Sequence, residues 1–447
     1  MLNTSGVVFL QLGAMAALAL YVAANLGAND VANSMGTSVG SKALTLRQAI
    51  IVAGILEFSG AVLFGQGVSE TLATGVVNAE VFAAKPQVFL IGMVSVLIAC
   101  GLWLQIATSR GLPVSSSHAV VGAIAGFSCV AGGIHAVDWW AIGTISLTWL
   151  ATPIASGALA ALFYSGVKYW ILDRPDPLFQ LREWIPWLSA GMLSVFGIIV
   201  LPSVVDVALV QTGAIASVYD RFGWNIPVHD IAIGIGSVGA IGLTLNSWKK
   251  LGLAGGHGGL EGGHGGTAPT TGGTNATVIE QQMARFQVIS ACFVAFAHGS
   301  NDVGNAVAPL AAIAYIRRTG SFPLEDFSVP LWILVLGGAG IVIGLAIWGE
   351  KVIATVGENI IQLQPSGGFC AELATATTVL LASDLGLPVS TSHALVGAVV
   401  GVGLIKGWKS VRWQTLVSIG SAWLVTIPIA AGLAAIIFSI AQWIARF

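Results

Sequence analysis

One polar motif occurs twice in this chain, each time inside a long apolar segment. Gly-Ala-Asn-Asp-Val-Ala-Asn at residues 27–33 returns as Gly-Ser-Asn-Asp-Val-Gly-Asn at residues 299–305. A second motif repeats in the same order: Gly-Leu-Pro-Val-Ser-Ser-Ser-His at residues 111–118 returns at residues 386–393 with one serine changed to threonine. Two halves that each place polar groups inside apolar segments are typical of secondary transporters, which build one central site between their repeats.

The composition indicates a membrane protein. Hydrophobic residues make up 55% of the 447 residues and charged residues 9%, whereas soluble domains carry about 25% charged residues. Several apolar stretches approach or exceed the ~20 residues that an α-helix needs to cross a bilayer. They are residues 7–26, 47–67, 88–108, 139–169, 187–207, 231–248, 286–297, 330–348 and 411–443. We therefore expect an all-α polytopic protein, integral and multi-pass, in the plasma (inner) membrane.

The repeated motifs divide the chain into two halves. We assign residues 1–170 to a first transmembrane repeat, 171–248 to additional transmembrane helices without a counterpart, and 285–447 to a second repeat. Residues 249–284 include a tract rich in Gly, Thr and His, which predicts a flexible linker, and basic residues beside this tract favour the cytoplasm. The sequence leaves open whether the two repeats run parallel or inverted.

The first motif offers oxygen ligands for a cation. Asn29 and Asn33 are four residues apart and share one face of a helix, so their amide oxygens converge with the carboxylate of Asp30. Such hard oxygens suit Na⁺. The second copy provides the same set, which is Asn301, Asp302 and Asn305. Helix breakers beside both copies predict broken helices, and they are Gly27, Gly36, Gly299, Gly304 and Pro309. The alternative is that each Asn-Asp pair only caps an interrupted helix, which explains one copy better than two matched copies.

The second motif has the chemistry of a helix start. Pro113 and Pro388 interrupt the segments before them, and hydroxyl side chains then lead into a short apolar stretch. The hydroxyl residues are Ser115, Ser116, Ser117, Ser390, Thr391 and Ser392. Free backbone N–H groups and the positive end of the helix dipole form an oxyanion site there without Arg or Lys. The apolar stretches are too short to span a membrane, so we expect two re-entrant hairpins. Helix capping and hydrogen bonds between helices are the alternative use of these hydroxyls.

Charge links the two motifs. Asp30 and Asp302 would strongly repel a divalent oxyanion in a medium of low dielectric constant. Cations must therefore bind together with the anion, and this coupling is reciprocal, so symport follows. Glu57 and Glu372 are further acidic residues in apolar surroundings. We interpret both as cation ligands or gates, although Glu372 also suits the start of a helix.

A histidine follows each hydroxyl triple, His118 in the first half and His393 in the second. A proton relay is one interpretation; we favour a neutral imidazole that forms a hydrogen bond within its own turn. Adjacency of Ser117 and His118 alone does not pair a nucleophile with a base, so we expect no enzyme. The cysteines lack metal-type spacing, and His257 and His264 are interpreted as linker spacers. We expect no cofactor, no transition-metal site and no nucleic-acid partner.

These motifs resemble those of the inorganic phosphate transporter family, in which both halves carry a Gly-Ala-Asn-Asp-Val-Ala-Asn-like signature. The resemblance covers nearly the whole chain apart from the linker. Gly-Thr-Ser-Val-Gly-Ser at residues 36–41 and Ala-His-Gly-Ser-Asn-Asp at residues 297–302 are similar to the sodium-coupled branch. The resemblance implies an inverted repeat, two hairpins that meet near the membrane centre, a homodimer, and phosphate held between the hairpins with sodium beside it.

The resemblance also implies roles for individual residues. Sodium would be bound by Asn29, Asp30, Asn301, Asp302, Glu57 and Glu372. Phosphate would be bound by the six hydroxyl residues together with Asn33 and Asn305. We thus expect sodium-coupled symport of inorganic phosphate by alternating access. The alternative is a proton-coupled phosphate or sulfate permease of the same fold, because tetrahedral sulfate fits the same cradle. A channel or a transport-like receptor is disfavoured, because broken helices that face each other argue against an open pore.

Overall fold

The computed structural model describes residues 4–110, 112, 114–205, 227–256, 272–323, 327–356 and 363–444. This part of the chain is built from α-helices and forms no β-strand beyond one isolated bridge between Val77 and Val137. The helices are α1 (Thr4–Gly40), α2 (Leu46–Phe64), α3 (Gln66–Thr74), α4 (Ala79–Ala83), α5 (Pro86–Ser109), α6 (Ser116–Gly132), α7 (Trp139–Val167), α8 (Pro177–Ile199), α9 (Leu201–Val205), α11 (Val228–Gly256), α12 (Gly272–Thr319), α13 (Leu331–Val356), α14 (Pro365–Asp384), α15 (Thr391–Lys406) and α16 (Trp413–Ile444). Short helical turns are η1 (Ile134–Ala136), η2 (Lys168–Leu172) and η4 (Trp408–Ser410).

Seven helices of the described part are long and apolar enough to cross a membrane. They include Leu10–Gly40 of α1 and Trp413–Ile444 of α16. The expected all-α polytopic membrane protein is thereby confirmed. Two predicted apolar stretches are not among these seven. Of the stretch 187–207, residues 187–205 lie across α8 and α9, and its last two residues lie outside the described part. Residues 286–297 lie within the 48-residue α12, which also carries charged and polar side chains.

Several helices begin where a side chain caps the first turn. Thr45 starts α2 with a capping box, because its hydroxyl accepts from the Gln48 N–H while the Gln48 side chain reaches back to the Thr45 N–H. Asp138 caps α7 and Asp176 caps α8 by accepting from the N–H group three residues on. These caps fix where α2, α7 and α8 begin.

The helix breaks predicted around the two Asn-Asp motifs are wrong. Both α1 and α12 run without interruption through the motif, and α12 continues past Pro309. The glycines instead allow close helix crossings: a Cβ on Gly27 would lie 2.1 Å from the main-chain oxygen of Ile341 in α13, and one on Gly299 would lie 2.0 Å from that of Glu57 in α2. Small residues let helix backbones approach in this way.

A substitution at Gly299 tests the importance of the crossing between α12 and α2. We expect Gly299→Ala to destabilise the protein by about 1–3 kcal/mol or more, because the new methyl group would overlap a backbone atom that no rotamer change can move. The measurement is the thermal unfolding midpoint of the purified protein in detergent. Gly432→Ala in α16 is the matched control, because nothing lies within 4 Å of its added Cβ. Equal midpoints for the two variants would contradict the assigned role.

The order of helices repeats along the chain. The series α1, α2, α5, α6, α7 is followed by α12, α13, α14, α15, α16, and in each series a long helix turns back into a short one, α5 into α6 and α14 into α15. Each short helix packs on the last helix of the other series. A Cβ on Gly122 of α6 would meet the main-chain oxygen of Ile427 in α16 at 2.7 Å, and one on Gly397 of α15 would meet that of Pro153 in α7 at 2.2 Å. Inversion of the two repeats stays a prediction.

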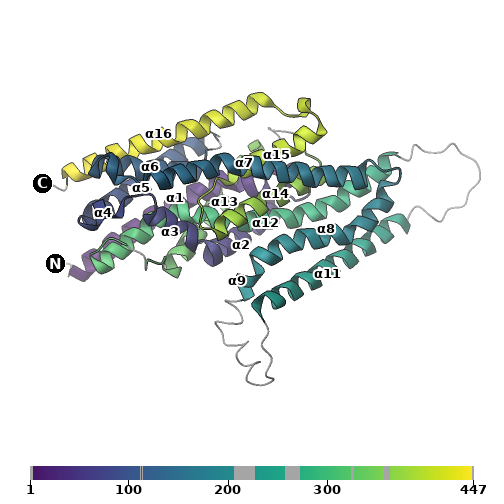
Figure 1. Ribbon diagram of the computed structural model, residues 1–447, viewed down its shortest axis with the longest axis horizontal. Helices are drawn as coiled ribbons and strands as arrows, with labels where there is room; N and C mark the ends of the chain where they lie inside the picture. Colours follow the sequence, from purple (N-terminus) through teal and green to yellow (C-terminus); the bar gives the residue numbers. More distant parts are fainter. Residues whose placement is uncertain are drawn as a thin grey trace, which may run out of the picture.

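Between the two series, the described residues form η2, α8, α9 and α11, and α8 and α11 lie side by side at one edge of the bundle (Figure 1). Helix α11 extends to Gly256 and α12 begins at Gly272, so helix covers both ends of the predicted linker 249–284. The start of α12 is held by packing, since Ile279 and Met283 are buried in a core cluster with α14. The remainder of the predicted linker, with His257 and His264, lies outside the described residues.

Candidate functional site

The asparagines that begin the repeated motifs fasten each long helix to a hairpin turn. The Asn29 side-chain amide donates to Thr108 Oγ1 at 2.9 Å and to the Leu112 carbonyl oxygen at 3.4 Å. Equivalent bonds occur in the second half, where the Asn301 amide donates to Ser383 Oγ at 3.0 Å and to the carbonyl oxygen of Leu387 at 3.1 Å. The N–H groups of both asparagines are thus directed at the turns that precede α6 and α15.

Thr108 and Ser383 were not predicted as site residues. Both stand three positions before the glycine that opens the Gly-Leu-Pro motif. This matched spacing is the signal that could have identified them. Gly111 and Pro113, which belong to the first copy of that motif, lie outside the described residues.

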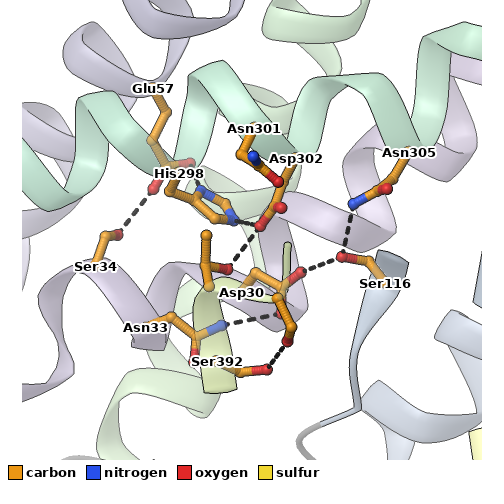
Figure 2. Close-up of polar contacts among 12 residues, drawn as sticks. Asp30, Asn33, Ser34, Glu57, Ser116, His298, Asn301, Asp302, Asn305 and Ser392 are labelled. Carbon is orange, nitrogen blue, oxygen red and sulfur yellow. Dashed lines mark hydrogen bonds and ion pairs between the residues drawn. The ribbon is translucent and has the colours of Figure 1, made fainter. Parts of the chain in front are cut away.

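The two aspartates face the starts of the short helices. Ser116 Oγ donates to Asp30 Oδ2 at 3.1 Å, and Thr391 Oγ1 donates to Asp302 Oδ2 at 2.7 Å. Asn305 joins the halves, because its amide donates to Ser116 Oγ at 3.1 Å. Figure 2 shows these groups converging from α1, α12 and the short helices. The structure therefore brings both predicted motifs into one buried cluster.

Capping confirms the predicted helix starts. Ser115 is the N-cap of α6 and Ser390 is the N-cap of α15, and each hydroxyl accepts the N–H of the histidine three residues on. Their hydroxyls also lie 3.1 Å from Ser117 Oγ and 2.9 Å from Ser392 Oγ, respectively. In both halves the first and third hydroxyls of the triple bind each other, while the second reaches an aspartate.

His298 bridges two carboxylates from different helices. Its Nδ1 lies 3.2 Å from Glu57 Oε2 in α2, and its Nε2 lies 3.0 Å from Asp302 Oδ2. Ser34 donates to the other oxygen of Glu57 at 2.8 Å. One ligand atom each of Asp30, His298 and Asp302 lie within 4.8 Å of one another. The sequence prediction missed His298, although its position one helical turn before Asp302 was a usable signal.

Glu372 lies in a separate polar cluster. Its carboxylate accepts hydrogen bonds from Thr37 at 2.5 Å, Ser38 at 2.7 Å, Ser290 at 2.8 Å and Gln287 at 3.2 Å. The proposed use of Glu372 as a charge at a helix start is wrong, because α14 begins seven residues earlier and has no acidic residue in its first turn. None of these four donors also bonds to Asp30, Asp302 or Glu57.

The buried polar groups of both clusters are acidic and rich in oxygen atoms. Among the buried side chains of the described residues there are four carboxylates, Asp30, Glu57, Asp302 and Glu372, and no lysine or arginine. Three buried oxygens near the repeated motifs, Asn29 Oδ1, Asp302 Oδ1 and Asn305 Oδ1, have no hydrogen-bond donor within the described part of the chain. Buried acceptors without donors are rare in folded proteins and indicate a missing partner.

Comparison with known proteins decides the family. A model described as "Phosphate transporter family" matches residues 26–434. The chain belongs to the phosphate transporter family. Among its relatives, an inorganic phosphate transporter 2-1, chloroplastic, from Arabidopsis thaliana is 40% identical over 93% of this chain and 70% of that protein. A putative phosphate permease from Haemophilus influenzae is 37% identical over 96% of both chains.

A solved structure of this family has the same architecture. It is named "The sodium-dependent phosphate transporter", is 34% identical in sequence, and superposes with a TM-score of 0.78 over 97% of this chain and 99% of that chain. The predicted resemblance to inorganic phosphate transporters is confirmed.

Proposed function

We propose that the protein is a secondary active transporter that moves inorganic phosphate across the membrane together with sodium ions. The observation that carries this proposal is the convergence of Asp30 and Asp302 on two helix starts in a buried cluster that contains no lysine or arginine among the described residues. Such a cluster can accept an oxyanion only when cations accompany it, because buried like charges repel strongly. The solved relative is named as sodium-dependent, which supports sodium as that cation.

Sodium would be held by the carboxylate and amide oxygens of the site. Asn29 and Asp302 each present a buried oxygen that lacks a donor within the described residues, and hard oxygens are the ligands that hard cations prefer. The proposed sodium residues are Asn29, Asp30, Asn301, Asp302, Glu57 and Glu372. Glu57 would act through His298, which faces it at ion-pair distance, while Glu372 would serve a second position.

Phosphate would bind at the starts of α6 and α15. Free N–H groups and the positive dipole end of each helix favour an anion there. The proposed phosphate residues are Ser115, Ser116, Ser117, Ser390, Thr391, Ser392, Asn33 and Asn305. Phosphate also carries hydroxyl groups of its own, and the aspartate oxygens are acceptors that would favour it over sulfate.

The hydroxyl hydrogen bonds suggest how the two ions are coupled. A hydroxyl has only one hydrogen to donate, and Ser116 and Thr391 donate theirs to Asp30 and Asp302. When a cation neutralises these carboxylates, the same hydroxyls are released to donate to the anion. Sodium binding would thus improve phosphate binding, and linkage requires the reverse effect to be equal.

The transport cycle is proposed to follow alternating access. The two hairpins, α5 with α6 and α14 with α15, would enter the membrane and return, because α6 and α15 are short apolar helices. Inverted repeats, a homodimer and a plasma (inner) membrane location are further proposals that rest on the family resemblance.

Uptake into liposomes tests this function. The purified protein is reconstituted, and uptake of radiolabelled phosphate is measured with a sodium gradient, a proton gradient or neither, with excess sulfate as competitor. We expect uptake that requires the sodium gradient and ignores sulfate. Uptake driven by a proton gradient alone would contradict sodium symport and indicate the proton-coupled alternative. Strong inhibition by sulfate would indicate a sulfate permease.

A further inference from the structure

Two histidines and two tryptophans form a buried crossed cluster behind the hydroxyl triples. His118 is the third residue of α6 and His393 is the third residue of α15. The two imidazole rings lie against each other, with centroids 4.8 Å apart. Trp149 belongs to α7 and Trp423 to α16. These four residues are called the His–Trp clamp below.

Each histidine contacts both tryptophans. The His118 ring packs on Trp149 with centroids 3.9 Å apart, and its Nδ1 lies 3.3 Å from the main-chain oxygen of Trp423. The His393 ring packs on Trp423 at 3.7 Å, and its Nδ1 lies 3.0 Å from the main-chain oxygen of Trp149. The expected hydrogen bond from each ring within its own turn is therefore not formed. The clamp instead joins two helices of the first series to two of the second.

The chemistry of the clamp fixes the proton positions. A carbonyl oxygen only accepts, so each Nδ1 must carry the hydrogen and donate it. Each Nε2 is then buried without a partner among the described residues. Both imidazoles are nearly inaccessible, with 4% of His118 and 5% of His393 exposed. Each ring is thus held by one carbonyl bond and by tilted or edge-on contacts with its aromatic neighbours.

The sequence of α7 explains why His393 bonds to the main-chain oxygen of Trp149. Pro153 lies four residues after Trp149 and has no N–H group, so the helix itself cannot donate to the Trp149 carbonyl. In a membrane such a freed carbonyl needs another donor, and His393 provides it. In α16 the proline is Pro428, five residues after Trp423, and Ile427 retains the N–H that can bond the Trp423 carbonyl. The Trp149 carbonyl therefore depends on His393 for a donor, whereas the Trp423 carbonyl does not depend on His118 in this way.

We propose that His393, assisted by His118, is a positioning residue that sets the separation of the two helix starts between which the anion binds. This inference rests on the proposed anion site. His393 stands two residues after Thr391, and His118 stands two after Ser116, so fixing each ring fixes the turn that presents the hydroxyl. One small anion must contact both turns at once, and a site of this kind requires its groups to be held closely in place.

Phosphate affinity at saturating sodium tests the proposal. The probe is radiolabelled inorganic phosphate, and its dissociation constant is measured by equilibrium dialysis with purified protein. His393→Phe keeps a ring but removes the donor, and we expect affinity to fall roughly tenfold, the order found when a residue that orients metal ligands is removed. His393→Asn places an amide N–H near the Nδ1 position and should restore most of the affinity. His118→Phe should have a smaller effect. The control is His135→Asn, an exposed histidine in η1.

A second variant separates positioning from simple stabilisation. Pro153→Ala returns an N–H to residue 153 that can bond the Trp149 carbonyl, as Ile427 can at Trp423 in α16, so in the double variant Pro153→Ala/His393→Phe this carbonyl keeps a donor. We expect the double variant to be more stable than His393→Phe in thermal unfolding, yet to bind phosphate several-fold more weakly than Pro153→Ala alone. Wild-type affinity in the double variant, or equal affinities for His393→Phe and the wild type, would overturn the proposal. Equal weakness of the Phe and Asn variants would also overturn it. Failure of the wild type to bind phosphate would overturn the proposed function first.

Discussion

Replacement of Asp30 or Asp302 by asparagine is expected to abolish sodium-stimulated phosphate uptake while each variant still reaches the membrane. Both carboxylates are buried, with 2% and 1% of the residue exposed. An amide keeps the size of the side chain but removes the charge that would hold a cation. Loss of one member of a buried charge pair costs about 2–5 kcal/mol, which corresponds to at least about tenfold in cation binding.

The measurement is phosphate uptake into liposomes as a function of sodium concentration. Asp230→Asn is the matched control, because the same chemical change is made at an exposed position of α11. We expect the control to retain wild-type sodium dependence. Normal sodium-stimulated uptake by both the Asp30 and the Asp302 variants would refute the assignment of these residues to a cation site.

The two aspartates should differ in one respect. Asp302 faces His298 at 3.0 Å as well as accepting from Thr391, whereas Asp30 accepts from Ser116 and Asn33. Asn at residue 302 would remove the charge that His298 faces and leave that ring with Glu57 alone. The thermal unfolding midpoint of Asp302→Asn should therefore be lower than that of Asp30→Asn, although both variants are expected to lose sodium-stimulated uptake.

Local chemistry explains why much of the site could be predicted from the sequence. Ser115 and Ser390 cap their helices as expected, because a hydroxyl before an apolar stretch satisfies a backbone N–H whatever lies around it. That the two motifs share one site followed from charge and repetition, although Asp30 and Ser116, which bond in the structure, are 86 positions apart. Duplication supplied this long-range information, since each half carried the same two motifs in the same order.

Other features depended on contacts that a sequence does not display. From the sequence, the glycines of the Asn-Asp motifs have the pattern of helix breakers, but in the structure Gly27 and Gly299 allow close crossings with α13 and α2. Which helix crosses at a glycine is decided by the tertiary fold. Similarly, His298 gains its importance from Glu57, a residue of another helix. Glu372 was grouped with the aspartates by residue type, whereas its partners place it in a different cluster.

Replacement of Ser116 and Thr391 together by alanine is expected to weaken phosphate binding strongly and sodium dependence less. These two hydroxyls come from opposite halves, and each donates to the aspartate of its own half. Under the proposed coupling they turn to the anion once cations neutralise the carboxylates. A hydrogen bond to a charged group contributes about 1.5–3 kcal/mol, so loss of two should raise the half-saturating phosphate concentration by at least about tenfold.

A double alanine variant at Thr319 and Ser421 is the control, since both are exposed hydroxyls that bond the carbonyl four residues earlier in their own helices. Uptake is measured at saturating sodium with phosphate varied, and then at saturating phosphate with sodium varied. If the hydroxyls only stabilised the aspartates, the sodium curve would shift most. A shift mainly in the phosphate curve would instead agree with hydroxyls that pass from carboxylate to anion during coupling, because the carboxylates remain available to sodium in the variant.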